Sequence, residues 1–151
     1  MKTISGDLIQ LAKAGKFDVI AHGCNCFCTM GAGIAKAVKD VFPAAFHADE
    51  VTPRRDRAKL GSCSFAEIPV GSSLLTVVNA YTQYDWRGRG PKLDYAAVRS
   101  CMAWIRKHYP GRRIGLPRLG AGLAGGDWPT ISTITEEELA GEDVTLVEYQ
   151  P

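Results

Sequence analysis

The sequence lacks the features of several classes of protein. It has no run of 18 apolar residues and no N-terminal signal pattern, so we expect a soluble, unsecreted cytoplasmic protein without membrane contact. Basic residues number 18 and acidic residues 16, and this near balance gives no strong signal for nucleic-acid binding. There is no internal repeat, and 151 residues are most simply one domain over 1–151, which we expect to be a monomer.

The cysteines do not form the pattern of a metal site. Cys24, Cys26 and Cys28 alternate, whereas zinc sites usually space paired cysteines by about two to four residues and add a second ligand pair. Only the isolated Cys63 and Cys101 remain. An odd count in an unsecreted chain predicts free thiols. We therefore expect small apolar packing groups here, with no metal and no cofactor.

Apolar runs and amphipathic stretches alternate along the chain, which predicts an α/β fold in which helices cover a sheet. The run at 18–21 is apolar after Asp18, which suggests a strand buried on both faces, and 74–80 is the most apolar segment and should be central. Strands are predicted at 2–5, 18–21, 61–68, 74–80, 113–119 and 144–149, and helices at 8–15, 32–42, 43–57, 93–109 and 127–139.

The stretch Ala21–Ala35 reads as a strand end, a loop of small residues and a helix N-terminus. The first turn of a helix has unpaired N–H groups and attracts anions, and glycines let that backbone approach a phosphate closely. The loop is neither a P-loop nor a complete dinucleotide fingerprint, because Gly31-Ala32-Gly33 lacks the third glycine. We predict that it binds phosphate, with His22 and Asn25 directed at the attached group.

A second glycine-rich loop follows a later strand, within Leu116–Trp128. Two such loops at the carboxyl ends of parallel strands face each other across one crevice of an α/β sheet. A pair of facing loops suits a diphosphate better than a single phosphate. The sequence therefore predicts that the two loops hold one diphosphate between them.

Three other features have two interpretations each. Asp7 either caps the helix that begins at Leu8 or accepts a hydrogen bond from a base amine. The loop Tyr81–Pro91 either faces the ligand or is an ordinary crossover. The basic cluster at 54–59 lacks interleaved aromatic residues, which favours a solvated face over a nucleic-acid patch.

These motifs resemble the macrodomain family. The similarity rests on Gly6–Leu8, on His22–Ala35 and on Pro117–Trp128, and it extends from the first strand to the last. It looks closest to the small stand-alone branch that contains the yeast-type ADP-ribose-1″-phosphate phosphatase and the terminal ADP-ribose glycohydrolase of animals. The resemblance implies a three-layer α/β/α fold, with a mixed sheet of about six strands between helices, and ADP-ribose or a derivative as the ligand.

The resemblance also implies roles for individual residues. Asp7 would bind the adenine amine with Leu8 against the ring, Asn25 would contact the terminal ribose, and Tyr149 is the nearest candidate to stack on adenine. Backbone N–H groups of the two loops would wrap the diphosphate and the terminal ribose; these residues are Gly31, Ala32, Gly33, Ile34, Gly120, Ala121, Gly122 and Leu123.

The chain departs from the animal glycohydrolase at two positions. Gln83 stands where that enzyme has a catalytic lysine, and Ala124 stands where it has the partner aspartate. A lysine-linked covalent mechanism is therefore not expected. His22 is shared with the phosphatase-like group, which is the better match.

The leading hypothesis is a hydrolase that acts at the terminal ribose of an ADP-ribose derivative, most concretely an ADP-ribose-1″-phosphate phosphatase. His22 or Asp127 would act as general acid or base; alternatively, His22 is a core residue and Asp127 a helix N-cap. Two other hypotheses are removal of ADP-ribose from protein or nucleic acid, and ADP-ribose binding without turnover. A dinucleotide-dependent oxidoreductase is disfavoured by the incomplete fingerprint.

Overall fold

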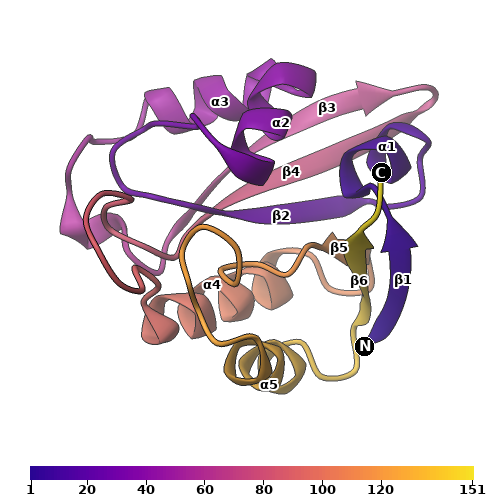
Figure 1. Cartoon of the computed structure of the whole chain (residues 1–151). Helices are drawn as coiled ribbons and strands as arrows, with labels where there is room; N and C mark the ends of the chain where they lie inside the picture. The colour runs from indigo at the N-terminus through magenta and orange to yellow at the C-terminus, as the bar shows by residue number, and fades with distance from the viewer.

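The computed structural model describes residues 1–151 and consists of one mixed sheet between two layers of helices. Figure 1 shows α2 and α3 on one side of the sheet and α4 and α5 on the other. The strands are β1 (Lys2–Gly6), β2 (Val19–Cys24), β3 (Cys63–Val70), β4 (Ser73–Tyr81), β5 (Arg113–Leu116) and β6 (Asp143–Tyr149). The helices are α1 (Leu8–Lys13), α2 (Gly33–Val41), α3 (Pro43–Glu50), the 3-10 turn η1 (Arg57–Lys59), α4 (Tyr95–His108) and α5 (Trp128–Glu138).

The sheet has the strand order β1-β6-β5-β2-β4-β3. All neighbouring pairs are parallel except β3 with β4, which form an antiparallel hairpin at one edge. The carboxyl ends of β1, β6, β5, β2 and β4 therefore lie along the same edge of the sheet. This confirms the predicted mixed sheet of six strands in a three-layer α/β/α fold.

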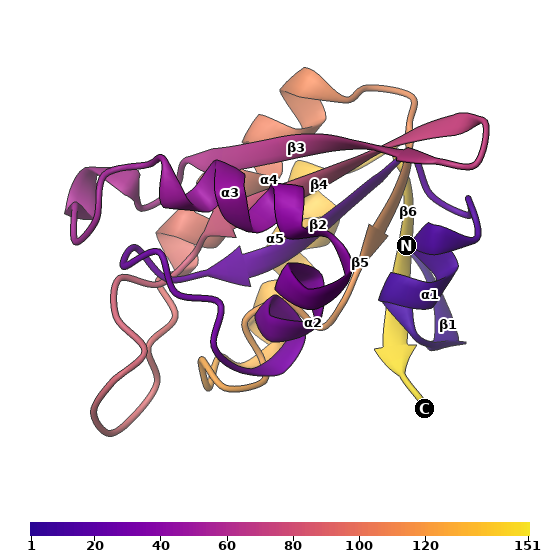
Figure 2. The same ribbon diagram turned by 90° about the horizontal axis from the view of Figure 1, so that it is seen from above.

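Alternation along the strands divides the apolar core between the two faces of the sheet. Val19 and Ala21 of β2 pack with α4 and α5, in one cluster of 15 buried residues. Ile20, between them, packs with α1, α2 and α3 in a second cluster of 11 buried residues. Figure 2 shows the central strands running between these helical layers. Both faces of β2 are covered, which explains why its residues are apolar or small except for the buried His22.

Several element boundaries differ from the sequence-based predictions. The strand predicted at 18–21 continues to Cys24, and the strand predicted at 113–119 ends at Leu116. The helix predicted at 43–57 ends at Glu50, ahead of Pro53, and only the short turn η1 follows. The extension of β2 has a consequence for the site, because it places His22 inside the sheet.

No helix has the length and apolar character needed to span a bilayer.

Candidate ligand-binding site at the carboxyl ends of the parallel strands

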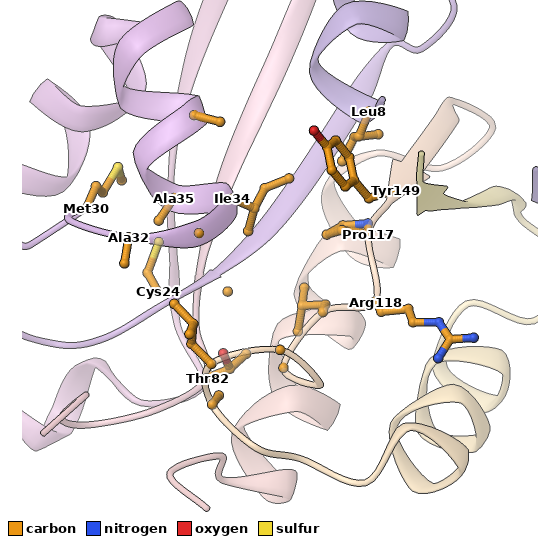
Figure 3. Close-up of a pocket in the computed structure, with 18 of the residues that line it drawn as sticks. Leu8, Cys24, Met30, Ala32, Ile34, Ala35, Thr82, Pro117, Arg118 and Tyr149 are labelled. Carbon is orange, nitrogen blue, oxygen red and sulfur yellow. The ribbon is translucent and has the colours of Figure 1, made fainter. Parts of the chain in front are cut away.

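A cavity of about 1030 Å³ opens where the parallel strands end. Every segment that leaves those strand ends contributes to its wall: Asp7 after β1, the loop after β2, Thr82 after β4, the loop after β5 and Tyr149 at the end of β6. Figure 3 shows Leu8 and Tyr149 at one end of the cavity and Thr82 at the other. Crevices of this kind are where open α/β sheets bind ligands.

Asp7 lies at the end of the cavity that also holds Leu8 and Tyr149. Its Oδ1 accepts hydrogen bonds from the backbone N–H groups of Ile9 at 2.9 Å and Gln10 at 3.2 Å. Asp7 is thus the N-cap of α1, as one of the two interpretations predicted. Oδ2 takes part in neither bond, so the carboxylate keeps one oxygen for a ligand. Tyr149 is 74% exposed.

The first glycine-rich loop leads into α2, and its backbone N–H groups are free. The N-cap of α2 is Ala32, whose side chain makes no capping bond, whereas α1, α4 and α5 all begin with a capping aspartate. The N–H groups of residues 31–34 donate no hydrogen bond within the protein, and all four residues line the cavity. Free N–H groups at a helix N-terminus attract anions.

The second loop presents free N–H groups from the other side. The N–H groups of Gly122, Leu123 and Ala124 have no acceptor in the protein, and these residues line the cavity. The two loops come into contact, since a Cβ added at Gly33 would lie 3.3 Å from Cδ1 of Leu123. Of the predicted loop residues, only Ala121 does not line the cavity; it packs against the apolar core, and its N–H donates to Arg118 O at 3.1 Å. The expectation for Ala121 is therefore corrected.

Neutral polar side chains line the end of the cavity opposite Tyr149. The Asn25 side chain is held in place, because its Nδ2 donates to Thr29 Oγ1 at 2.7 Å and its Oδ1 accepts from Phe27 N–H at 2.8 Å. Thr82 and Gln83 follow directly after β4. Burial raises the pKa of the Cys24 thiol well above its ordinary value, so this thiol stays protonated at neutral pH.

Gln83 carries the single buried side-chain polar atom of the protein that has no hydrogen-bond partner. This atom is Oε1, and the residue lines the cavity. A buried acceptor without a partner costs about 1–3 kcal/mol, so such atoms in native structures call for an explanation. Sequence reasoning noted Gln83 only for the lysine that it replaces. Its position just after the buried strand β4 could have identified Gln83 as a cavity residue from the sequence.

The cysteines of the first loop are packing groups, as predicted. Cys24 and Cys26 belong to a small buried cluster with Met30 and Tyr81. The backbone of Cys26 is fixed on both sides, since its N–H donates to Tyr84 O at 2.9 Å and its carbonyl accepts from Arg55 N–H at 2.8 Å. These bonds anchor the loop that carries Asn25.

His22 lies outside the cavity, which argues against the predicted role in catalysis. The side chain is 1% exposed, and Nε2 lies 2.7 Å from Asn79 Oδ1 in the interior. Asn79 in turn donates to the backbone carbonyl of Ala45 in α3 at 2.9 Å. Burial lowers the pKa of His22 to about 4. The structure therefore places His22 as a neutral, hydrogen-bonded residue between the sheet and α3.

The lowered pKa predicts a specific dependence of stability on pH. The neutral form is favoured in the folded protein, so between about pH 6.5 and pH 4 the unfolded chain binds more protons at this residue. Stability contributed by His22 is complete above this window and is lost as the pH falls through it. From pH 7 to pH 5 the wild type should lose about 2 kcal/mol through this residue.

Urea unfolding of the wild type and of His22→Leu at both pH values measures this contribution. The variant is expected to be less stable at pH 7, because Asn79 Oδ1 loses its partner, and to lose about 2 kcal/mol less than the wild type on acidification. Equal losses in the two proteins would contradict the prediction.

Asp127 also lies outside the cavity, and it caps α5. Its Oδ2 accepts from Thr130 N–H at 3.1 Å and from Thr130 Oγ1 at 2.6 Å, and its own N–H donates to the Tyr95 hydroxyl at 2.9 Å. The interpretation as a helix N-cap accounts for these contacts. Neither residue predicted as general acid or base thus borders the cavity.

The loop Tyr84–Pro91 contacts the basic cluster, whose arginines are exposed as expected of a solvated face, whereas Lys59 is buried. Arg57 lies over the Tyr84 ring, with Cζ 3.9 Å from the ring centroid. Phe27 makes edge contacts with Tyr84 and Trp86, at centroid distances of 5.0 and 5.5 Å. Trp86 lines the cavity, so this loop faces the site. The aromatic partners come from distant parts of the sequence, which is why the cluster seemed isolated.

The sequence and the fold were compared with those of known proteins. No family model matches the sequence. A 17.5 kDa protein encoded in the tk–vs intergenic region of enterobacteria phage T4 is 35% identical over 156 residues, covering 100% of this chain and 97% of the phage protein.

Solved structures match over nearly the whole chain. A protein of Bacteroides thetaiotaomicron aligns with a TM-score of 0.79 at 25% identity, covering 99% of this chain and 98% of that one. The macrodomain of Mycobacterium tuberculosis DarG aligns with a TM-score of 0.75 at 24% identity, over 99% and 97% of the two chains. Thermosipho africanus DarTG, solved in complex with ADP-ribose, aligns with a TM-score of 0.74 at 19% identity, over 99% of this chain and 41% of that one.

Proposed function

We propose that this chain, which belongs to the same family as the 17.5 kDa protein of phage T4 and has the macrodomain fold, binds ADP-ribose in the cavity described above. Adenine would lie between Leu8 and Tyr149, with its amine donating to the free Oδ2 of Asp7. The diphosphate would lie between the two glycine-rich loops. The terminal ribose would reach Asn25 and Gln83 at the opposite end.

The observation that carries this proposal is the double row of free N–H groups. Residues 31–34 and 122–124 present them from opposite sides of one cavity, in loops that touch each other. Free N–H groups at a helix N-terminus and in a facing loop form an anion-binding site, so the two sets favour a ligand rich in acceptor oxygens. A diphosphate provides acceptors on both sides. Two solved neighbours, Thermosipho africanus DarTG and a Trypanosoma brucei macrodomain, were obtained in complex with ADP-ribose.

The finer proposal is hydrolysis at the terminal ribose, most concretely of ADP-ribose 1″-phosphate. Two residues with amide side chains, Asn25 and Gln83, line the cavity, and the terminal ribose would lie beside them. A second candidate is binding without turnover, and the placement of His22 and Asp127 outside the cavity favours it. An ADP-ribosyl group on protein or nucleic acid is the alternative substrate.

Calorimetry combined with product analysis tests these proposals. ADP-ribose is expected to bind at least about tenfold more tightly than adenosine, because adenosine lacks the groups that meet the loops. ADP-ribose 1″-phosphate, modified protein and modified DNA are then incubated with the protein, and ADP-ribose and phosphate are measured. No heat with ADP-ribose would overturn the binding proposal, and binding without product from any derivative would establish the second candidate.

A further inference from the structure

A buried lysine contacts the first glycine-rich loop from outside the cavity. Lys59, in the turn η1, is 6% exposed and is not among the residues that line the cavity. It takes part in no ion pair. A buried ammonium group is costly unless other groups replace its hydration. The contacts that replace it therefore indicate what this side chain does.

The ammonium group of Lys59 contacts two residues of that loop. Its Nζ donates to Cys26 O at 3.4 Å and to Cys28 Sγ at 3.5 Å. It also lies 4.5 Å from the centroid of the Tyr81 ring, whose face attracts a cation. Figure 1 shows the chain between α3 and β3, which includes η1, beside the loop that follows β2. The hydrogen bonds of Lys59 are thus directed at the loop between β2 and α2.

The contact with Cys28 is the one that Lys59 alone supplies. Cys26 O also accepts from Arg55 N–H at 2.8 Å, so it keeps a partner without the lysine. Cys28 has φ 59°, in the left-handed region, where a residue other than glycine costs about 1–3 kcal/mol and persists only if its surroundings hold it. The Cys28 thiol donates to Asp49 O at 3.2 Å, and the same sulfur accepts from Lys59. These contacts hold the strained turn in place.

The turn at Cys28 determines the orientation of Asn25. Thr29 follows Cys28 directly, and its Oγ1 accepts from Asn25 Nδ2 at 2.7 Å. Asn25 and Thr29 line the cavity and are partly exposed, whereas Cys26 and Cys28 between them are buried. The second N–H of the Asn25 amide and the second lone pair of its Oδ1 remain for a ligand.

We propose, building on the ADP-ribose binding proposed above, that Lys59 is a positioning residue for the terminal ribose. The lysine holds the turn at Cys28, this turn places Thr29, and Thr29 orients the Asn25 amide toward the ribose hydroxyls. Lys59 itself touches no part of the ligand. The N–H groups of residues 31–34 lie beyond this turn, at the start of α2. Loss of the lysine should therefore affect recognition of the ribose more than binding of the diphosphate.

Calorimetry with ADP-ribose and ADP tests this proposal, because ADP lacks the terminal ribose. The wild type is expected to bind ADP-ribose about tenfold more tightly than ADP, the size of one hydrogen bond. Lys59→Met removes the ammonium group and should bring the ratio of the two affinities close to one. A loss of folded protein would lower both apparent affinities equally and leave their ratio unchanged. Lys107→Met, at an exposed lysine of α4 outside the cavity wall, is the matched control and should keep the wild-type ratio.

A double-mutant cycle with Asn25→Ala tests whether Lys59 acts through Asn25. Asn25→Ala alone should also bring the ratio close to one, and in that background Lys59→Met should not change it further. An unchanged ratio in Lys59→Met, or the same effect of Lys59→Met with and without Asn25, would overturn the positioning role. A wild type that binds ADP-ribose and ADP equally would overturn this inference and leave diphosphate binding in place. A wild type that binds neither would overturn the proposed function and this inference with it.

Discussion

Gly122→Val is expected to weaken ADP-ribose binding at least about 100-fold, a loss of about 2.7 kcal/mol, without lowering the melting temperature. Gly122 lines the cavity, and a Cβ added there meets no atom within 4 Å. Its φ lies outside the left-handed region, so valine is not strained. The valine methyl groups would occupy the space beside the free N–H groups of residues 122–124. A diphosphate could then no longer approach the second loop.

The choice of ligands separates this effect from a general loss of affinity. Calorimetry with ADP-ribose, ADP and adenosine should show a large loss for the two diphosphates and a small one for adenosine. Gly31→Val should act in the same way from the first loop, because a Cβ there is also in open space. Ser72→Val, in the hairpin turn between β3 and β4, is the control for an added side chain away from the cavity. Unchanged ADP-ribose affinity in Gly122→Val would place the diphosphate elsewhere.

Gly33 offers a contrast on the same loop. It has φ 59°, and a Cβ there would lie 3.3 Å from Leu123 Cδ1. Gly33→Val would therefore strain the backbone and push the loops apart, and a binding loss in that variant would have two causes. Gly122 and Gly31 are the informative positions because their backbones already suit any residue.

The two glycine-rich loops could be predicted from local sequence patterns, and their proximity could be predicted from the topology of parallel sheets. A buried apolar run followed by small residues and a helical period marks the carboxyl end of a parallel strand, and topology brings such ends together. Asp7 and Asn25, which the family resemblance singled out, also line the cavity. The register β2–β5 then sets the two loops beside each other.

The sequence left His22 with two interpretations, and the catalytic one was preferred because the end of β2 was placed at Ala21. The strand continues to Cys24 through pairing with β4, where His22 lies opposite Asn79. Alternation turns the side chain to the same face as Ile20, beneath α3. Because the predicted end of β2 was three residues too early, His22 was expected in the cavity, although it lies in the interior. The hydrophobic periodicity of a sequence does not show how a strand pairs with its neighbours, and this pairing determines where β2 ends.

Gln83 is a different case, since its significance depends on an interaction that is missing. A glutamine after a strand has no distinctive pattern in the sequence. Only the packed structure reveals that Oε1 is enclosed and lacks a donor. Asp127 was noted from the sequence both as a general acid or base and as a helix N-cap. Its hydrogen bonds with Thr130 support the N-cap.

Asp7→Asn is expected to weaken ADP-ribose binding about 100-fold while leaving the stability of α1 nearly unchanged. Asparagine and aspartate are similarly effective N-caps, so Oδ1 of the asparagine can still accept from the N–H groups of Ile9 and Gln10. That requirement turns Nδ2 toward the position of the free Oδ2. The adenine amine would then meet a donor in place of a charged acceptor.

The magnitude follows from the groups that are exchanged. A hydrogen bond to a charged group contributes about 1.5–3 kcal/mol, and two facing donors add a desolvation cost. Asp7→Ala is the matched variant, because it removes the ligand contact and the cap together. Thermal unfolding should show a loss of about 1 kcal/mol for alanine and little change for asparagine, whereas calorimetry should show weak binding for both. If Asp7→Asn bound ADP-ribose as tightly as the wild type, the carboxylate would serve the helix alone, and adenine recognition would rest on Leu8 and Tyr149.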